Sequence, residues 1–231
     1  MKTEKIIGLL LVFGAIAVFV PYTILTVIFD YPDILRQDAG VVLTRFHAGG
    51  SQMIWVWWAF AVSGLPLLVA YILLGQYLES KWRWAKVATT LGIISGIAQI
   101  VGLLRWVFVM PVLARTYATT DDPATQAAAK VVFQAVHQFG GVVLGEHIGQ
   151  LFTIAWTVML AAAFAKLKLI PKWASGLGYV ASAIYLLAQA ELFATIMPGF
   201  PVWDLAGLIG STLWLVWLIV VGLRFLKIKT A

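Results

Sequence analysis

The sequence has no cysteine and few charged residues. Of its 231 residues only 11% are charged and 62% are hydrophobic, whereas soluble domains are about 25% charged and about 45–50% apolar. The absence of cysteine excludes a disulfide scaffold and thiol catalysis. A soluble globule of this length cannot bury so much apolar surface, so the composition predicts an integral membrane protein and excludes a nucleic-acid-binding domain.

Long apolar runs occupy most of the chain. A membrane-crossing helix needs about 20 mostly apolar residues, and six segments meet this requirement. We expect an all-α polytopic membrane helix bundle, one domain over residues 1–231, with spans at about 6–29, 51–78, 87–113, 141–165, 174–194 and 205–226, and outer segments at 30–50 and 114–140. The first run continues to Phe29, longer than the core of a signal peptide, so we expect a span there.

The basic residues are distributed unevenly over the ends and loops of these spans. Eleven of the 16 fall at the two termini and in the loops after the second and fourth spans, and four lie on the opposite side. The positive-inside rule therefore predicts that both termini are cytoplasmic. Trp55, Trp57 and Trp58 mark the outer end of the second span, as interfacial anchors do. The net charge of +6 is thus interpreted as a topology signal, with the lipid bilayer as the surroundings.

Local signals refine the helices. Asp122 followed by Pro123 is a typical helix start, and we expect this helix to run into the fourth span with a bend at Gly140-Gly141. Small and polar residues at helical spacing predict packing seams on the third and fifth spans: Ala88, Gly92, Ser95, Gln99 and Gly102, then Gly178, Ser182, Tyr185 and Gln189.

Ionisable side chains in or beside the spans share one depth. Six of them fall in the outer leaflet or at its surface: Arg105, Glu146, Glu191, His47, His137 and His147. Arg105 lies about 12 Å below the predicted end of the third span. Because a charge inside a membrane needs compensation, Arg105 is predicted to pair with Glu146.

The fourth span has one polar side. At 100° per residue this side carries Val143, Glu146, His147, Gln150, Thr153 and Thr157. We therefore expect His147 and Gln150 to extend the network around Glu146. Glu191 lies on another face and is expected to meet Arg45 or the outer water.

This polar group leaves several functions open. One is a pocket that binds a small amphipathic or apolar ligand, and another is a structural or accessory membrane subunit that serves a membrane-protein partner. A haem or metal site and a transport pathway are the remaining alternatives. His47, His137 and His147 are the candidate metal ligands, but no helix carries a chelating pair, so no metal is expected. No nucleophile–base pair is visible, and the sequence predicts neither a reaction nor a cofactor.

Four motifs follow one another along the chain: FDYPDILR, RFHAGG, GLLRWVFVMPVLA and GEHIGQLF. In this order across six spans they resemble an uncharacterised bacterial membrane family of the domain-of-unknown-function type, most specifically over Phe29–Leu160. The resemblance implies a location in the bacterial inner membrane. It implies no activity, so the candidate site depends on the residues themselves.

Overall fold

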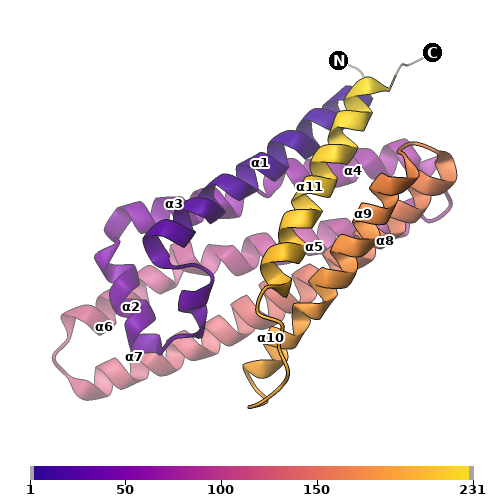
Figure 1. The fold of residues 1–231 in the computed structure, drawn as a ribbon. Coiled ribbons are helices and arrows are strands. Elements are labelled where there is room, and N and C mark those ends of the chain that lie inside the picture. The colour runs from indigo at the N-terminus through magenta and orange to yellow at the C-terminus, as the bar shows by residue number, and fades with distance from the viewer. Residues whose placement is uncertain (1–2, 229–231) are drawn as a thin grey trace. The chain divides into compact units, whose positions relative to one another are not determined.

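The computed structural model describes residues 3–228, and every regular element in that range is helical (Figure 1). This confirms the predicted all-α class. Lys2 and Lys229, which count toward the predicted topology, lie outside the described residues. The elements are α1 (Thr3–Phe29), η1 (Asp33–Arg36), α2 (Ala39–Ala48), α3 (Gly50–Val62), α4 (Leu65–Glu79), α5 (Ala85–Phe108), α6 (Met110–Thr119), α7 (Pro123–Val136), η2 (His137–Ile148), α8 (Gly149–Leu167), α9 (Lys172–Leu187), α10 (Gln189–Ala194) and α11 (Ala206–Lys227).

Several of these elements join into longer helices. Six helices in the described range are long and apolar enough to cross a membrane: Thr3–Phe29, Gly50–Glu79, Ala85–Thr119, Pro123–Leu167, Lys172–Ala194 and Ala206–Lys227. Each predicted span falls on one of them, so the predicted number of spans is confirmed.

The third and fourth helices are longer than a membrane requires. With 35 and 45 residues, they measure roughly 50 Å and 70 Å, compared with about 30 Å for the hydrocarbon layer. The predicted helix start between them is confirmed, because the Asp122 carboxylate accepts hydrogen bonds from the backbone N–H groups of Ala124 and Thr125. The Thr125 hydroxyl and these N–H groups hold the pKa of Asp122 below its ordinary value.

The fourth helix changes its winding where the sequence predicts a bend. Over 12 residues, His137–Ile148, it is a π-helix, η2, which contains both Gly140 and Gly141. A π-helix bonds each residue to the fifth one along the chain, is rare, and is frequently found at functional sites. The glycine pair therefore marks a wider helical turn.

The chain divides into two compact units, which we describe separately. Within the described range, unit 1 comprises residues 3–16, Gly64–Ala98 and 147–228. In it α9 packs against α8 and also against α11 (Figure 1). A Cβ on Gly210 of α11 would lie 2.7 Å from the backbone of Tyr185, so α11 and α9 are in backbone contact. Hydrogen bonds from Ser95 to Gly149 and Thr153 join α5 to α8, so both predicted seams are packing surfaces.

Unit 2 comprises Ala17–Ser63 and Gln99–Glu146. In it α6 packs against α2 and α7 (Figure 1). α2 is capped by Asp38, which accepts from the Gly40 N–H and lies 3.1 Å from the Lys130 ammonium. These two contacts hold the pKa of Asp38 below its ordinary value. The core of the unit is a cluster of large buried side chains that includes Phe29 and Trp106.

Candidate functional site

Aromatic and basic side chains of unit 2 form one contiguous group. We call it the Arg105 cluster and define it as Trp57, Arg105, Trp106, Phe133 and His137. Trp106 is its centre: its indole stacks on Trp57 with ring centroids 4.7 Å apart, and the guanidinium carbon of Arg105 lies 5.3 Å from its ring centroid. His137 meets Trp106 edge-on at 6.2 Å and stacks on Phe133 at 5.4 Å. The cluster therefore joins α3, α5, α7 and η2.

Glycines of η2 make room for the guanidinium. A Cβ on Gly141 would lie 2.5 Å from Nη2 of Arg105, so a larger residue would displace the side chain. A Cβ on Gly102 would lie 2.7 Å from the Cα of Gly145, so α5 and η2 approach backbone to backbone. The π-helical winding and the glycines together bring Arg105 against the backbone of η2.

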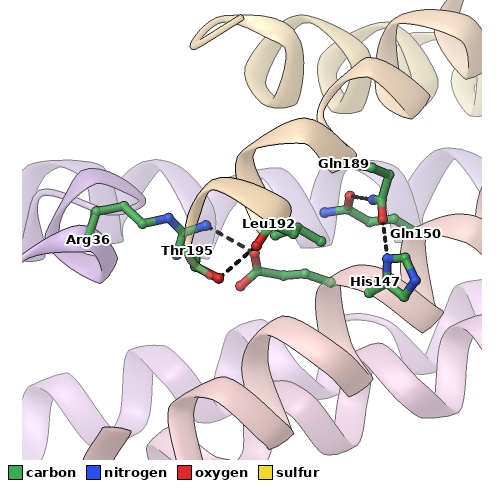
Figure 2. A network of polar contacts seen from close by, with 7 residues as sticks. Arg36, His147, Gln150, Gln189, Leu192 and Thr195 are labelled. Carbon is green, nitrogen blue, oxygen red and sulfur yellow. Dashed lines mark hydrogen bonds and ion pairs between the residues drawn. The ribbon is translucent and has the colours of Figure 1, made fainter. Parts of the chain in front are cut away.

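Arg105 is buried and only partly satisfied. It is 8% exposed, its Nη1 donates to the carbonyl oxygen of Gly102 in its own helix, and its Nε has no hydrogen-bond acceptor. The predicted Arg105–Glu146 ion pair is wrong. Instead, Oε2 of Glu146 lies 3.3 Å from Nη2 of Arg36, the last residue of η1 (Figure 2). The charges of Glu146 and Arg36 both act on Arg105, but neither residue hydrogen-bonds to it in the part of the chain described.

The other nitrogen atoms of the cluster are also without partners. His137 is 7% exposed, and both of its ring nitrogens lack a hydrogen bond. The buried indole nitrogens of Trp57 and Trp106 lack one as well. Buried polar groups in proteins are normally hydrogen-bonded, so four unsatisfied side chains in contact are unusual. The cluster offers N–H donors and one positive charge, with few acceptors.

The end of α1 shows where the cluster lies along the helices. The ring of Phe29, the last residue of α1, meets Trp57 and Trp106 edge-on at 6.1 and 5.5 Å. The predicted depth of Arg105 used Leu113 as the end of the third span, but that helix continues to Thr119. Measured against α1, Trp106, the residue next to Arg105 in α5, lies beside the residue that ends the first span.

His147 and Gln150 form a separate group in unit 1. Nδ1 of His147 lies 2.7 Å from Oε1 of Gln189, and Nε2 of Gln189 donates to Oε1 of Gln150 at 2.5 Å (Figure 2). His147 and Gln150 were predicted to extend a network around Glu146, but both contact Gln189 instead, and Glu146 bonds to Arg36. Glu191 lies in the first turn of α10 and is partly buried.

The remaining predicted residues lie on α2. Arg45 donates to the Asp30 carboxylate, and this ion pair compensates its positive charge. His47 is exposed. Within residues 3–228 no group of three or more His, Cys, Asp and Glu side chains is placed to hold a metal ion.

Five contributors were not predicted as site residues: Arg36, Trp57, Trp106, Phe133 and Gln189. Trp57 was interpreted as an interfacial anchor but is fully buried, whereas Trp55 is 65% exposed. The available signals were the position of Trp106 beside Arg105 and that of Gln189 at the end of the predicted packing seam of the fifth span. Nothing in the local sequence singles out Arg36 as the partner of Glu146.

Six membrane-crossing helices and 11% charged residues define the class of this chain, a polytopic integral membrane protein. A family model described as "Domain of unknown function (DUF4386)" matches residues 6–222. The match covers most of the chain, so the protein belongs to this family, and the predicted resemblance is confirmed. No curated protein and no solved structure gives a significant match.

Proposed function

We propose that the protein binds a small amphipathic molecule whose polar head lies against Arg105 and His137. One observation carries this proposal: a buried guanidinium and imidazole lie in one cluster, and both have nitrogens without protein partners. A buried charge that lacks compensation destabilises a protein by several kcal/mol, roughly 3–5 when one member of a pair is removed. A bound head group supplies the compensation, and the surrounding aromatic rings suit an apolar tail.

The height of the cluster supports a ligand taken from the membrane. With 27 residues, α1 measures roughly 40 Å and crosses the hydrocarbon layer before it ends at Phe29, beside the cluster. The cluster is therefore close to a membrane surface, where the heads of amphipathic molecules lie. The basic loops favour cytoplasmic termini, and we propose that this surface is the outer one of a bacterial inner membrane.

A structural or accessory role is the second candidate. The Arg36–Glu146 ion pair favours it, because a partly buried pair can set the register of packed segments without any ligand. In this case the protein would serve a membrane-protein partner and have no chemistry of its own. A stoichiometric partner that stays bound during purification would support this candidate.

Native mass spectrometry of the purified protein tests the proposal. We expect the wild-type protein to carry one small molecule, which is lost in Arg105→Gln. Arg115→Gln is the matched control, because it removes an exposed arginine ten residues further along the same helix, and it is expected to keep the molecule. A wild-type protein without any bound small molecule would overturn the proposal. A haem absorption band of the purified protein would also overturn it and would indicate a haem protein instead.

The orientation has its own test. A reporter fused after the C-terminus that is active only in the cytoplasm should be active, because the basic loops predict a cytoplasmic C-terminus. If a reporter that works only outside the cytoplasm is active instead, the predicted topology is wrong. The cluster would then lie near the inner surface of the membrane.

A further inference from the structure

We infer that the head group bound by the Arg105 cluster is a single carboxylate. This inference rests on the proposed function and names the ligand class of the same site. Three observations in unit 2 carry it: the kind of hydrogen-bonding atoms left free, the net charge of the group, and the geometry of the free edge of Arg105.

The free atoms of the cluster are mostly donors. The unpartnered atoms are Nε of Arg105, both indole nitrogens of Trp57 and Trp106, and the two ring nitrogens of His137. Arginine Nε and indole nitrogen only donate, and a neutral imidazole contributes one donor and one acceptor. A ligand that satisfies this set needs acceptor oxygens. A hydroxyl oxygen can accept these hydrogen bonds, but the hydroxyl must also donate its own proton. The cluster has at most one acceptor for it, the unprotonated nitrogen of His137.

The positive charge of the Arg105 cluster is on Arg105. Arg36 and Glu146 are 3.3 Å apart and neutralise each other, and Arg105 has no acidic side chain as a hydrogen-bond partner. A monovalent anion completes the balance. A phosphate monoester, with a charge of about −2, would leave an excess of negative charge at a buried position.

Arg105 presents a free edge of suitable shape. Its Nη1 is occupied by the Gly102 carbonyl oxygen, whereas its Nε is free. A carboxylate accepts two parallel hydrogen bonds from one edge of a guanidinium, and such bonds are among the strongest in proteins. Gly141 lies against this part of the side chain without a Cβ, which would come within 3.2 Å of Nε. The absence of a side chain at Gly141 thus lets the guanidinium lie against the backbone of η2, with its Nε buried and without an acceptor.

The test compares three probes of equal chain length on the detergent-purified wild-type protein: dodecanoate, its uncharged methyl ester and dodecyl phosphate. Binding is read by native mass spectrometry. We expect dodecanoate to bind and the ester to bind roughly tenfold to a hundredfold more weakly, because the ester loses the charge-assisted bonds. We expect dodecyl phosphate to bind less tightly than dodecanoate.

Variants locate the binding site. Arg105→Gln should weaken dodecanoate binding by a similar factor, whereas Arg115→Gln should leave it unchanged. Gly141→Val should also weaken it, because the added side chain displaces the guanidinium. If a variant does not fold, the comparison of probes on the wild-type protein still decides.

The outcomes separate this inference from the proposed function. Equal binding of acid and ester overturns the carboxylate but leaves an amphipathic ligand in place. Tighter binding of the phosphate, or dodecanoate binding that Arg105→Gln does not change, also overturns the carboxylate at this site. If no probe binds and the purified protein carries no small molecule, both proposals fail.

Discussion

The two units of the molecule treat buried polar groups differently. In unit 1 the polar side chains mostly satisfy one another: the Trp214 indole donates to Thr157, and Gln189 joins His147 to Gln150. Unit 1 also has unpartnered buried atoms, on Ser175, Ser182 and Trp217, but none of them carries a charge. In unit 2 the unpartnered set includes the Arg105 guanidinium.

This difference is the reason why we place the proposed ligand in unit 2. A buried serine or indole without a partner destabilises a protein by about 1–3 kcal/mol, which a well-packed helix bundle tolerates. A buried guanidinium that lacks a counter-charge costs more and needs a compensating group. Unit 1 therefore satisfies more of its buried polar atoms, and unit 2 is the part that would gain from the proposed ligand.

The largest expected effect comes from the centre of the aromatic group in unit 2. Trp106→Ala should lower the free energy of unfolding by about 3–5 kcal/mol, because Trp106 is fully buried against Trp57 and Phe29. Trp55→Ala is the control, since this side chain is 65% exposed and its loss should matter little. Denaturant unfolding in detergent micelles measures both. Equal effects would mean that Trp106 is not a core residue.

Replacing Arg105 by an apolar residue should change the free energy of unfolding in the opposite direction. Arg105→Met should raise the stability of the ligand-free protein by about 1–4 kcal/mol, because it replaces a buried charge that has no acidic hydrogen-bond partner with an apolar side chain of similar length. The same variant should lose ligand binding. Arg115→Met, at an exposed position, should change neither property. A large loss of stability in Arg105→Met would mean that the charge is compensated within the protein.

Unit 1 should lose stability when its polar group is opened. Gln189→Leu leaves Nδ1 of His147 and Oε1 of Gln150 without their partner, which should cost about 1–3 kcal/mol. Gln76→Leu, on an exposed position of α4, is the matched control. Ligand binding should be unchanged in both variants. A loss of binding in Gln189→Leu would place a binding residue in unit 1.

The ion pair of unit 2 should show a modest coupling. A double-mutant cycle with Arg36→Gln and Glu146→Gln should give up to about 1 kcal/mol, because both side chains keep 29% and 22% of their surface exposed. The cycle of Arg105→Gln with Glu146→Gln should give less, since these residues share no hydrogen bond. A larger coupling energy for Arg105 with Glu146 than for Arg36 with Glu146 would support the Arg105–Glu146 pair that the sequence predicts.

The smallest effect concerns the cap of α2. The pKa of Asp38 is lowered in the folded protein by Lys130 and the Gly40 N–H, so its contribution to stability is present above the unfolded pKa and is lost as the pH falls through the folded one. Thermal stability should therefore decrease below about pH 4. Asp38→Asn should show a weaker decrease over the same range. An unchanged pH profile in Asp38→Asn would mean that this cap does not contribute.

Much of the fold could be predicted from local sequence. Apolar runs of about 20 residues specify membrane-crossing helices, and Asp122 before Pro123 specifies a helix start from a few neighbouring atoms. The candidate site was only partly predictable. Arg105 and His137 stand out in the sequence because polar groups are rare in apolar spans, whereas His147 and Gln150, selected by the same signal, lie in a separate group of unit 1. The partners of these residues were not found.

Two residues show why the partners escaped. Glu146 could bond to either of two arginines by charge alone, and the distance of 3.3 Å to Arg36 depends on how the segment after α1 folds back, 110 residues away in the sequence. Trp57 has the composition and position of an interfacial anchor, yet Phe29, Phe60 and Trp106 surround it. Side chains that come together across such separations are chosen by packing, which no local pattern reports.

The sequence by itself thus determined the membrane class, the number of spans and the helix boundaries near Pro123, because hydropathy and capping act over one or two helical turns. Only the tertiary structure decided that η2 is π-helical, that Gly141 receives the guanidinium of Arg105, and that this charge has no acidic hydrogen-bond partner. These features depend on the close approach of two helix backbones, at Gly102 and Gly145. That approach results from the packing of the whole unit.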